Sequence, residues 1–434
     1  MLIIDIDENV KAVFNPETLR IWTFPADQWN LFEQTEPENL SEEAVAAQLG
    51  QPRNDPVLNQ PGTLDAPDTF DTLILHVTHN CNMACKYCYE RNNHYMADPG
   101  MMSEQTALRA VELFYSRYSY IREIKFFGGE PTLNQSVIQS VCKYVNQMHA
   151  AGKIKKKPVF RLLTNGTIMN NTLIELIQKY KIKIVFSIDG IKAVHDNLRV
   201  FPNGTGTYDL IKKNFFMLRK ETKGEQPYSL NVTYSAFHKN LGLSMHDLVV
   251  KLSDEYAVPP KKINIYPVDT EPLQPFYLNT EQIMLQSARD ALEHAMQGDS
   301  RTHLKLKAVI RRLEKGGTLQ KTLCPAADTW AAVSYTGNVY PCMMFLDRDE
   351  YFMGNISSDI FNTGSYHAVK ERFNKGYRSQ DPHCKSCIAK NLCFYCAGEN
   401  EFETGEIYPR GEKSCEEFRE IVKIAVTGVA LGVW

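Results

Sequence analysis

Three cysteines lie close together in the stretch CNMACKYC, namely Cys81, Cys85 and Cys88, with the spacing C-x3-C-x2-C. A disulfide cluster would need an even number of cysteines, and a zinc site usually takes four ligands from paired Cys or His units. The neighbouring histidines fit no familiar zinc-finger spacing. Closely spaced thiolates also hold iron–sulfur clusters, and three of them would leave one iron open to a ligand that is not protein. We therefore predict an iron–sulfur site.

A second group of cysteines lies in the C-terminal part of the chain. Its dense part reads CKSCIAKNLCFYC, a C-x2-C-x5-C-x2-C spacing that a zinc ribbon also shows. The seven members are Cys324, Cys342, Cys384, Cys387, Cys393, Cys396 and Cys415. The eleventh cysteine, Cys142, falls in an amphipathic helical pattern, where we expect a small core residue.

The bulk composition is that of an ordinary globular protein, with 434 residues, 43% hydrophobic and 23% charged residues, and a net charge of −3. This charge favours neither nucleic acid nor membrane as a partner. The N-terminus has no secretion-signal pattern, and the apolar tail IVKIAVTGVALGVW is too short to span a bilayer. We expect a cytoplasmic protein whose cysteines serve metal or redox chemistry, with the tail as a packing helix or strand.

Elements that would position the first cysteines begin at Thr72. Six apolar, strand-like runs alternate with helical patterns there, at residues 72–78, 123–128, 158–164, 182–188, 228–234 and 263–268. Such alternation predicts an α/β fold with a parallel sheet and helices outside it. Because six units are fewer than the eight of a full barrel, we expect an incomplete, TIM-like (β/α)6 barrel.

The unusual residues follow the ends of these strands, where βα-barrels place their chemistry. The first cysteines follow the first strand-like run, and the motif GGEP follows the second run. The motif TNGT follows the third run, and SIDG ends the fourth. Gly128 and Gly129 would let a ligand approach the backbone, and Glu130 could accept hydrogen bonds from an ammonium group. Ser187 and Asp189 would face one side of a strand and suit a ribose diol. Taken alone, GGEP and SIDG also fit ordinary turns.

Together these motifs resemble those of the radical S-adenosylmethionine (SAM) enzymes, over about residues 70–270. The resemblance implies that Cys81, Cys85 and Cys88 hold a [4Fe–4S] cluster whose fourth iron is chelated by SAM. Reduction by an electron donor such as flavodoxin or ferredoxin would then cleave SAM to a 5′-deoxyadenosyl radical. By the resemblance, the amino group of SAM is bound by Gly128, Gly129 and Glu130, and its ribose or carboxylate by Ser187 and Asp189. Tyr87 would contact the adenine region by its backbone. Asn165 and Arg199 are further candidates for SAM contacts.

The C-terminal cysteines resemble a SPASM domain, which carries two auxiliary iron–sulfur clusters in peptide-modifying radical SAM enzymes. One departure is the last interval, which has two residues where the family more often has three. By the resemblance, Cys384, Cys387, Cys393 and Cys415 complete the second auxiliary cluster. Cys324, Cys342 and Cys396 remain for the first, which leaves one of its irons open. Three [4Fe–4S] clusters are therefore expected in all.

We expect four regions along the chain. Residues 1–66, with short strands and a helix between Ser41 as N-cap and Gly50 as stop, form a small α+β unit before a proline-rich linker. This unit is short for a precursor-peptide recognition domain, but it is our candidate for one. Residues 67–270 would form the radical SAM partial barrel, 271–323 a helical bridge and 324–434 the SPASM domain.

The resemblance implies a maturase that crosslinks a ribosomally made precursor peptide bearing a leader sequence. The open iron suggests that the crosslink is a thioether. Carbon–carbon or carbon–oxygen crosslinking is an alternative, and so is anaerobic sulfatase maturation, whose enzymes carry an acid directly after the cysteine matching Cys342, where this chain has Met343. A non-catalytic zinc-binding adaptor is the alternative of another class. The sequence assigns no general base.

Overall fold

The computed structural model describes residues 1–31, 37–59, 68–88, 99–268, 270, 273–278, 283–302, 304–318, 324–374, 381–393, 396–408 and 411–434. The expected boundaries at residues 66 and 271, and part of the expected linker, lie outside this set. All of the site residues predicted from the sequence lie within it.

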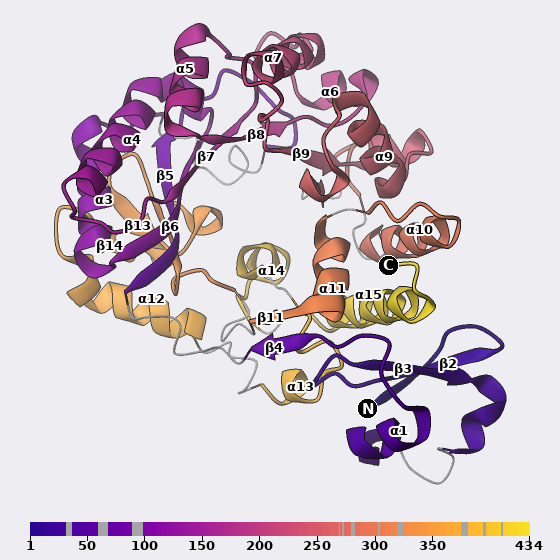
Figure 1. The fold of residues 1–434 in the computed structure, drawn as a ribbon. Helices are drawn as coiled ribbons and strands as arrows, with labels where there is room; N and C mark the ends of the chain where they lie inside the picture. The colour runs from indigo at the N-terminus through magenta and orange to yellow at the C-terminus, as the bar shows by residue number, and fades with distance from the viewer. Residues whose placement is uncertain are drawn as a thin grey trace.

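Six parallel strands form the centre of the fold, adjacent to one another in chain order. They are β5 (Thr69–Thr78), β6 (Tyr120–Gly128), β7 (Val159–Thr164), β8 (Lys183–Ser187), β9 (Ser229–Tyr234) and β10 (Ile263–Pro267). Each coincides with one of the six predicted runs, which confirms the α/β class and the parallel sheet. Figure 1 shows the strands following an arc, with helices along its outer side.

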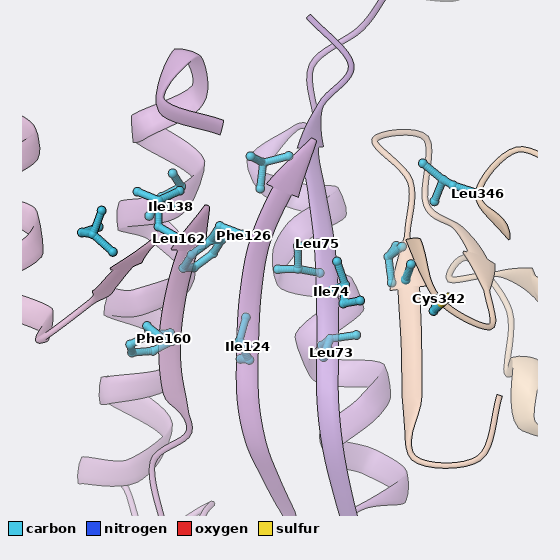
Figure 2. Packing of buried hydrophobic residues seen from close by; sticks show 14 of the residues in the cluster. Leu73, Ile74, Leu75, Ile124, Phe126, Ile138, Phe160, Leu162, Cys342 and Leu346 are labelled. Carbon is cyan, nitrogen blue, oxygen red and sulfur yellow. The ribbon is translucent and has the colours of Figure 1, made fainter. Parts of the chain in front are cut away.

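Helices cover the outer face of this sheet. They are α3 (Glu104–Arg117), α4 (Gln135–Ala150), α5 (Asn171–Tyr180), α6 (Lys192–Leu198), α7 (Tyr208–Glu221), α8 (Ala236–Asn240) and α9 (Met245–Tyr256). Alternation along the strands decides which side chains meet them. Ile124, Phe126 and Leu162 are fully buried on the outer face with Ile138 of α4 (Figure 2). Cys142 of α4 is also fully buried in this core, as expected.

The C-terminal region extends the same sheet. Strand β12 (Trp330–Val333) pairs in parallel with β5, and β13 (Asn338–Tyr340) and β14 (Gly354–Asn355) follow it in antiparallel pairing. The result is one nine-stranded sheet that runs from β10 to β14. The sequence did not predict this continuity, because the pattern of β12 is only four residues long and its partner β5 lies far away in the chain.

The N-terminal region is a three-stranded antiparallel sheet of β1 (Leu2–Asp5), β2 (Val10–Phe14) and β3 (Ile21–Pro25) with one helix, α1 (Glu42–Leu49). As predicted, Ser41 caps α1 by accepting a hydrogen bond from the Ala44 amide, and Gly50 ends it with a φ of 74°. One face of the sheet packs on α1. The other face, with Phe14 and Ile21, shares a core with helices from the C-terminal half.

The remaining elements are divided between this second core and the core of the large sheet. They are β4 (Val57–Asn59), α10 (Ile283–Met296), α11 (Leu304–Lys315), β11 (Gly316–Thr318), α12 (Gly364–Asn374), α13 (Pro382–Lys385), α14 (Ala397–Thr404) and α15 (Glu412–Leu431). Strands β4 and β11 form a separate parallel pair. The apolar tail is helix α15, which packs on α10 and α11 and confirms the packing role expected from its sequence. None of the described helices is long and apolar enough to cross a membrane.

Candidate active site

The loop that carries the first three cysteines leaves the end of β5 and is fixed by its backbone. The Ala84 amide donates to the Val200 carbonyl at 2.7 Å, and the Lys86 amide donates to the Leu198 carbonyl at 2.9 Å. Burial, with smaller contributions from nearby Glu130, Cys85 and Cys88, raises the pKa of the Cys81 thiol to about 12 against the opposing hydrogen bond from the Met83 amide. The fold therefore brings the three thiols together at the carboxyl end of the sheet, a donor set that suits an iron–sulfur cluster.

The two glycines of GGEP lie against this loop. A Cβ on Gly128, whose φ is 134°, would stand 2.0 Å from the Thr78 carbonyl oxygen, and a Cβ on Gly129 would stand 2.4 Å from the Asn80 carbonyl oxygen. The Gly129 amide donates a hydrogen bond to the Thr78 carbonyl at 2.9 Å. The sequence analysis predicts that these glycines let a ligand approach the backbone, which stays a prediction. In the structure the close neighbour is the backbone of the cysteine loop itself, so the glycines set the position of that loop.

Glu130 links this region to the loop after β7. Its side chain is fully buried, and its Oε1 accepts hydrogen bonds from the Thr132 amide (3.0 Å), the Thr132 hydroxyl (2.6 Å) and the Thr164 hydroxyl (2.7 Å). Its Oε2 accepts from the Asn165 amide at 2.7 Å. Burial raises the pKa of this carboxyl, while the hydrogen bonds oppose the rise.

Asn165 extends the connection to the cysteine loop. Its side-chain amide donates to Asn82 Oδ1 at 2.9 Å and lies 3.9 Å from the Cys81 sulfur. Asn82 in turn donates to the Thr167 hydroxyl at 2.8 Å. A continuous set of polar contacts thus runs from buried Glu130 to the first cysteine.

Asp189 belongs to a second buried network. Strand β8 ends at half-buried Ser187, so the alternation expected from the sequence does not extend to Asp189. Asp189 is fully buried and accepts hydrogen bonds from the Tyr87 hydroxyl and, at 3.1 Å, from the Thr233 amide. Arg199 Nη1 donates to the Tyr87 oxygen at 2.9 Å. The fold thus joins three predicted SAM-site residues, Tyr87, Asp189 and Arg199, through their side chains.

Burial and charge shape the ionisation of this network. Burial raises the pKa of the Tyr87 phenol well above its ordinary value, the Arg199 charge opposes this, and the Asp189 charge adds to it. Burial lowers the pKa of Arg199, but neighbouring Tyr87, Cys85 and Asp189 outweigh it, so the pKa lies well above its usual value. Arg199 therefore stays charged beside the cysteine loop.

Two histidines that the sequence analysis did not single out hold the backbone of Asp189. The Asp189 amide donates to His195 Nδ1 at 3.2 Å, and His238 Nε2 donates to the Asp189 carbonyl at 2.8 Å. Because His195 Nδ1 accepts, Nε2 carries the proton and donates to the Thr207 hydroxyl at 3.0 Å. Burial, with a contribution from Arg199, lowers the pKa of His195 to about 2.

A third polar group connects the two cysteine-bearing halves of the chain. His79 lies just before the cysteine loop, and its Nε2 is 3.6 Å from Oδ2 of Asp347. The ring centre of His79 is 4.6 Å from the ring centre of Tyr335. Asp347 follows Cys342 by five residues and has a φ of 55°, a conformation that favours glycine. Strain of this kind often marks functional sites. The sequence could not predict this contact, because His79, Tyr335 and Asp347 are single residues from segments that lie far apart in the chain.

The C-terminal thiols form two groups in the structure. Burial raises the pKa of the Cys342 thiol well above its ordinary value, and the neighbouring thiols Cys324 and Cys396 raise it further. Burial also raises the pKa of Cys384, to about 11, with contributions from Asp381 and from the thiols Cys393, Cys387 and Cys415. These are the same two sets that the sequence assignment separates. Glu399 and Tyr408, which the sequence analysis missed, lie beside the first set.

No group of three or more His, Cys, Asp or Glu side chains within the described ranges is arranged to hold a single metal ion. The donor sets that suit iron–sulfur clusters are the three thiols after β5 and the two sets of thiols in the C-terminal region.

Comparison with known families bears on these groups of thiols. Residues 75–232 match the Radical SAM superfamily, and residues 324–388 match SPASM, an iron-sulfur cluster-binding domain. The chain carries a radical SAM domain followed by a SPASM domain. Its cofactors are SAM and iron–sulfur clusters, and this identification removes the non-catalytic zinc-binding adaptor as an alternative.

Three curated relatives of this radical SAM enzyme differ in how much they share with it. Uncharacterized protein MJ0907 of Methanocaldococcus jannaschii is 33% identical over 35% of this chain, which spans only about half (49%) of that relative. The antilisterial bacteriocin subtilosin biosynthesis protein AlbA of Bacillus subtilis is 25% identical over 83% of this chain and 73% of its own. A cysteine-type anaerobic sulfatase-maturating enzyme of Clostridium novyi is 21% identical over 81% of this chain and 94% of its own.

Solved structures share the fold of the radical SAM and SPASM regions. Native anSMEcpe with bound AdoMet and Cp18Cys peptide superposes with a TM-score of 0.67 at 18% identity, covering 84% of this chain and 100% of that one. Streptococcus suis SuiB bound to the precursor peptide SuiA gives a TM-score of 0.53 at 15% identity, covering 80% and 76%.

Proposed function

We propose that this enzyme is a peptide maturase that forms an intramolecular thioether, between a cysteine sulfur and a carbon, in a ribosomally synthesised precursor. SAM with its cluster supplies a 5′-deoxyadenosyl radical that removes a hydrogen atom from carbon. The relationship to AlbA, a bacteriocin biosynthesis protein matched over most of this chain, supports a peptide substrate. The observation that carries the thioether is the grouping of only three thiols, Cys324, Cys342 and Cys396, in the first SPASM set.

A cysteine of the substrate would complete that set of thiols. Metal coordination deprotonates a thiol and fixes its sulfur, so the sulfur would be held ready to close the bond. In the overall balance, the carbon–hydrogen and sulfur–hydrogen bonds break and a carbon–sulfur bond forms. One hydrogen atom leaves with the deoxyadenosyl group, the thiol proton passes to a base, and one electron passes to an oxidised iron–sulfur cluster. The product is therefore lighter than the precursor by two hydrogens.

Residues around the first cysteine loop would bind SAM in this proposal. Cys81, Cys85 and Cys88 hold its cluster. Glu130 binds the amino group through Oε2, which accepts one hydrogen bond from Asn165 and has capacity for another. Tyr87, Asp189 and Arg199 form one side of the SAM site through their shared network, with Ser187 beside them.

Residues 1–66 are proposed to hold the leader of the precursor by adding a strand to their small sheet. Their position supports this. Asn391 Nδ2 donates to the carbonyls of Pro16 (2.9 Å) and Glu17 (3.1 Å), and Lys390 forms an ion pair with Glu17. A leader held on this sheet would lie near the loop that carries Cys387 and Cys393.

Co-expression of the enzyme with a cysteine-bearing precursor, followed by mass spectrometry, tests the proposal. A thioether maturase yields a peptide lighter by two hydrogens in which one cysteine resists alkylation, and a Cys→Ser precursor stays unmodified. A product that loses two hydrogens while every cysteine remains open to alkylation would replace the thioether with carbon–carbon or carbon–oxygen crosslinking. Oxidation of a single cysteine to an aldehyde would indicate sulfatase-type maturation instead, which the Met343 found after Cys342 disfavours.

A further inference from the structure

Several cationic side chains gather on the inner face of the sheet, opposite the face that the helices cover. Lys125 of β6, Arg161 of β7 and Lys183 of β8 pair in register across three strands, and they alternate with outward-facing Ile124, Phe126, Leu162 and Ile184. Lys262 immediately precedes β10. Because successive strand residues face opposite sides, the three cations that lie within strands share the inner face of the arc.

The cations surround one aromatic ring. The Arg161 guanidinium lies 5.1 Å, Lys183 Nζ 4.6 Å and Lys262 Nζ 4.5 Å from the ring centre of Tyr228. Tyr228, Lys183 and Lys262 are half-buried, so they remain within reach of a ligand. The negative face of an aromatic ring attracts each cation, but it does not neutralise three of them.

Within the described part of the chain, one carboxylate forms ion pairs with members of this cluster. Glu123 Oε2 accepts from Arg161 Nε at 2.8 Å and Nη2 at 2.7 Å, and its Oε1 lies 3.9 Å from Lys125 Nζ. Glu123 is thus occupied by Arg161 and Lys125. Among the residues that the structure describes, no carboxylate forms an ion pair with Lys183 or Lys262. Like charges that lie close together in a half-buried place repel one another and favour an anionic ligand.

The thiolates of the first SPASM set could balance part of this charge, and Lys125 is the cation placed to do so. Lys125 is buried, and its Nζ lies 4.8 Å from the ring centre of Trp330. Burial lowers the pKa of Lys125, while the charge of a Cys342 thiolate acts to raise it, so the two groups are neighbours. Lys183 and Lys262 contact Tyr228 instead. The charges of Lys183 and Lys262 would therefore be balanced by an anion other than the SPASM thiolates.

We infer that Lys183 and Lys262, with Arg161 and Tyr228, bind an acidic side chain of the substrate peptide. This inference rests on the proposed peptide substrate and adds a preference for aspartate or glutamate near the modified residue. The site adjoins Lys125, which neighbours Cys342, and β7 and β8 lead from it towards the SAM-site loops at their carboxyl ends. An acidic residue held here would fix how the peptide lies between the two sites, and charge-assisted hydrogen bonds would favour it over its neutral amide.

The test uses the holoenzyme, with clusters reconstituted anaerobically and SAM bound. The probes are two synthetic peptides that differ only in charge, acetyl-Gly-Cys-Gly-Glu-Glu-Gly-amide and its Gln-Gln counterpart. Isothermal titration calorimetry should show the Glu peptide binding about tenfold more tightly, as expected of one or two charge-assisted hydrogen bonds. Lys183→Gln combined with Lys262→Gln should abolish the difference. Lys213→Gln combined with Lys220→Gln, which removes the same charge from the exposed surface of α7, should preserve it.

Two readouts separate the possible failures. The double variant must keep wild-type iron content and reductant-driven SAM cleavage, and Lys262→Gln alone serves if the double variant does not fold. Equal affinity of the wild-type enzyme for both peptides, or discrimination that survives in the double variant, would overturn the inference. Because binding is measured without turnover, a precursor that is never crosslinked while discrimination persists would count against the proposed function and not against the acidic-residue site.

Discussion

Glu130 connects three loops through one buried carboxylate. Its four hydrogen bonds come from the turn after β6 and the loop after β7, and Asn165 carries the connection to Asn82 and Cys81. A carboxylate only accepts hydrogen bonds, and all four partners are donors. The side chain therefore positions the first cysteine loop as well as being a proposed SAM ligand.

Replacement of Glu130 by Gln tests this arrangement at a single atom. The new NH2 group would face a donor, either the Asn165 amide or the threonine donors, so at least one hydrogen bond to a charged group is lost at a cost of about 1.5–3 kcal/mol. We expect a lower melting temperature and weaker SAM binding by calorimetry. Glu175→Gln, on the exposed surface of α5, is the matched control and should change neither. Wild-type SAM affinity in Glu130→Gln would show that the carboxylate has no part in the SAM site.

At the scale of elements, the pair β5–β6 and the turns that follow them form the support of the cysteine loop. Gly128 and Gly129 allow the loop backbone to cross β6 at a distance that no other residue type permits. The parallel pairing ends with Thr78 opposite Gly128, where the register also shifts. The loop geometry thus depends on two positions without side chains.

A methyl group at position 129 should displace the cysteine loop. In Gly129→Ala the new Cβ would meet the Asn80 carbonyl at 2.4 Å, and a backbone atom yields less readily than a side chain. We expect reconstituted protein to lose one cluster, about four of about twelve irons, by chemical iron analysis. Gly364→Ala, where a Cβ has open space and φ is ordinary, is the control. Full iron content with normal SAM cleavage in Gly129→Ala would contradict the role given to this glycine.

The N-terminal sheet and helix α15 depend on each other for burial. Phe14 and Ile21 share a core with Val422 and Ala425 of α15, although the sequence suggested a separate unit over residues 1–66. Deletion of that unit would therefore expose apolar surface on the rest of the protein. A leader-binding experiment needs substitutions on the sheet surface in place of a deletion.

Phe14→Ala measures this mutual dependence. Phe14 is fully buried, and removing such a side chain typically costs about 3–5 kcal/mol. We expect a clear shift of the denaturant midpoint, together with easier proteolysis of α15. Leu273→Ala should be close to neutral, since Leu273 is 92% exposed. If α15 stays protected in Phe14→Ala, the two parts are independent after all.

The sequence predicted elements and thiols well where local information suffices. Each barrel strand is a short run rich in apolar residues, and Ser41 and Gly50 follow local capping rules. Strand β11 reads Gly-Gly-Thr and pairs with β4, so no apolar pattern could indicate it. The thiol groups follow from residue type and spacing. The network of Tyr87, Asp189 and Arg199 depends on distances between separate loops, which spacing along the chain does not encode.

At the scale of the whole molecule, three groups of thiols are spread over two regions that share one sheet. The first group lies after β5, and the SPASM groups lie around and beyond β12–β14. Parallel pairing of β12 with β5 fixes the SPASM region directly beside the strand that leads into the first cysteine loop. Electron transfer between the two regions would therefore not require a moving domain.

Removing the thiols group by group should separate the clusters. After anaerobic reconstitution we expect about twelve irons per chain, and about eight in the variant in which Cys81, Cys85 and Cys88 are all Ala. That variant should form no 5′-deoxyadenosine, measured by chromatography. Replacing Cys384, Cys387 and Cys393 should also remove about four irons but leave reductant-driven SAM cleavage in place. Formation of 5′-deoxyadenosine by the first variant would refute the assignment of the SAM-cluster ligands.

The pairing of β12 with β5 also constrains the order in which the chain is made. When β5 leaves the ribosome, the strand that will cover its free edge has not been synthesised, because Trp330 pairs with Thr72 across more than half of the chain. At ~5–20 residues per second, that edge waits roughly tens of seconds for its partner. An uncovered apolar edge strand is a template for pairing between nascent chains. Expression at a lower temperature, or with added chaperones, should therefore improve the soluble yield more than changes made to the folded surface.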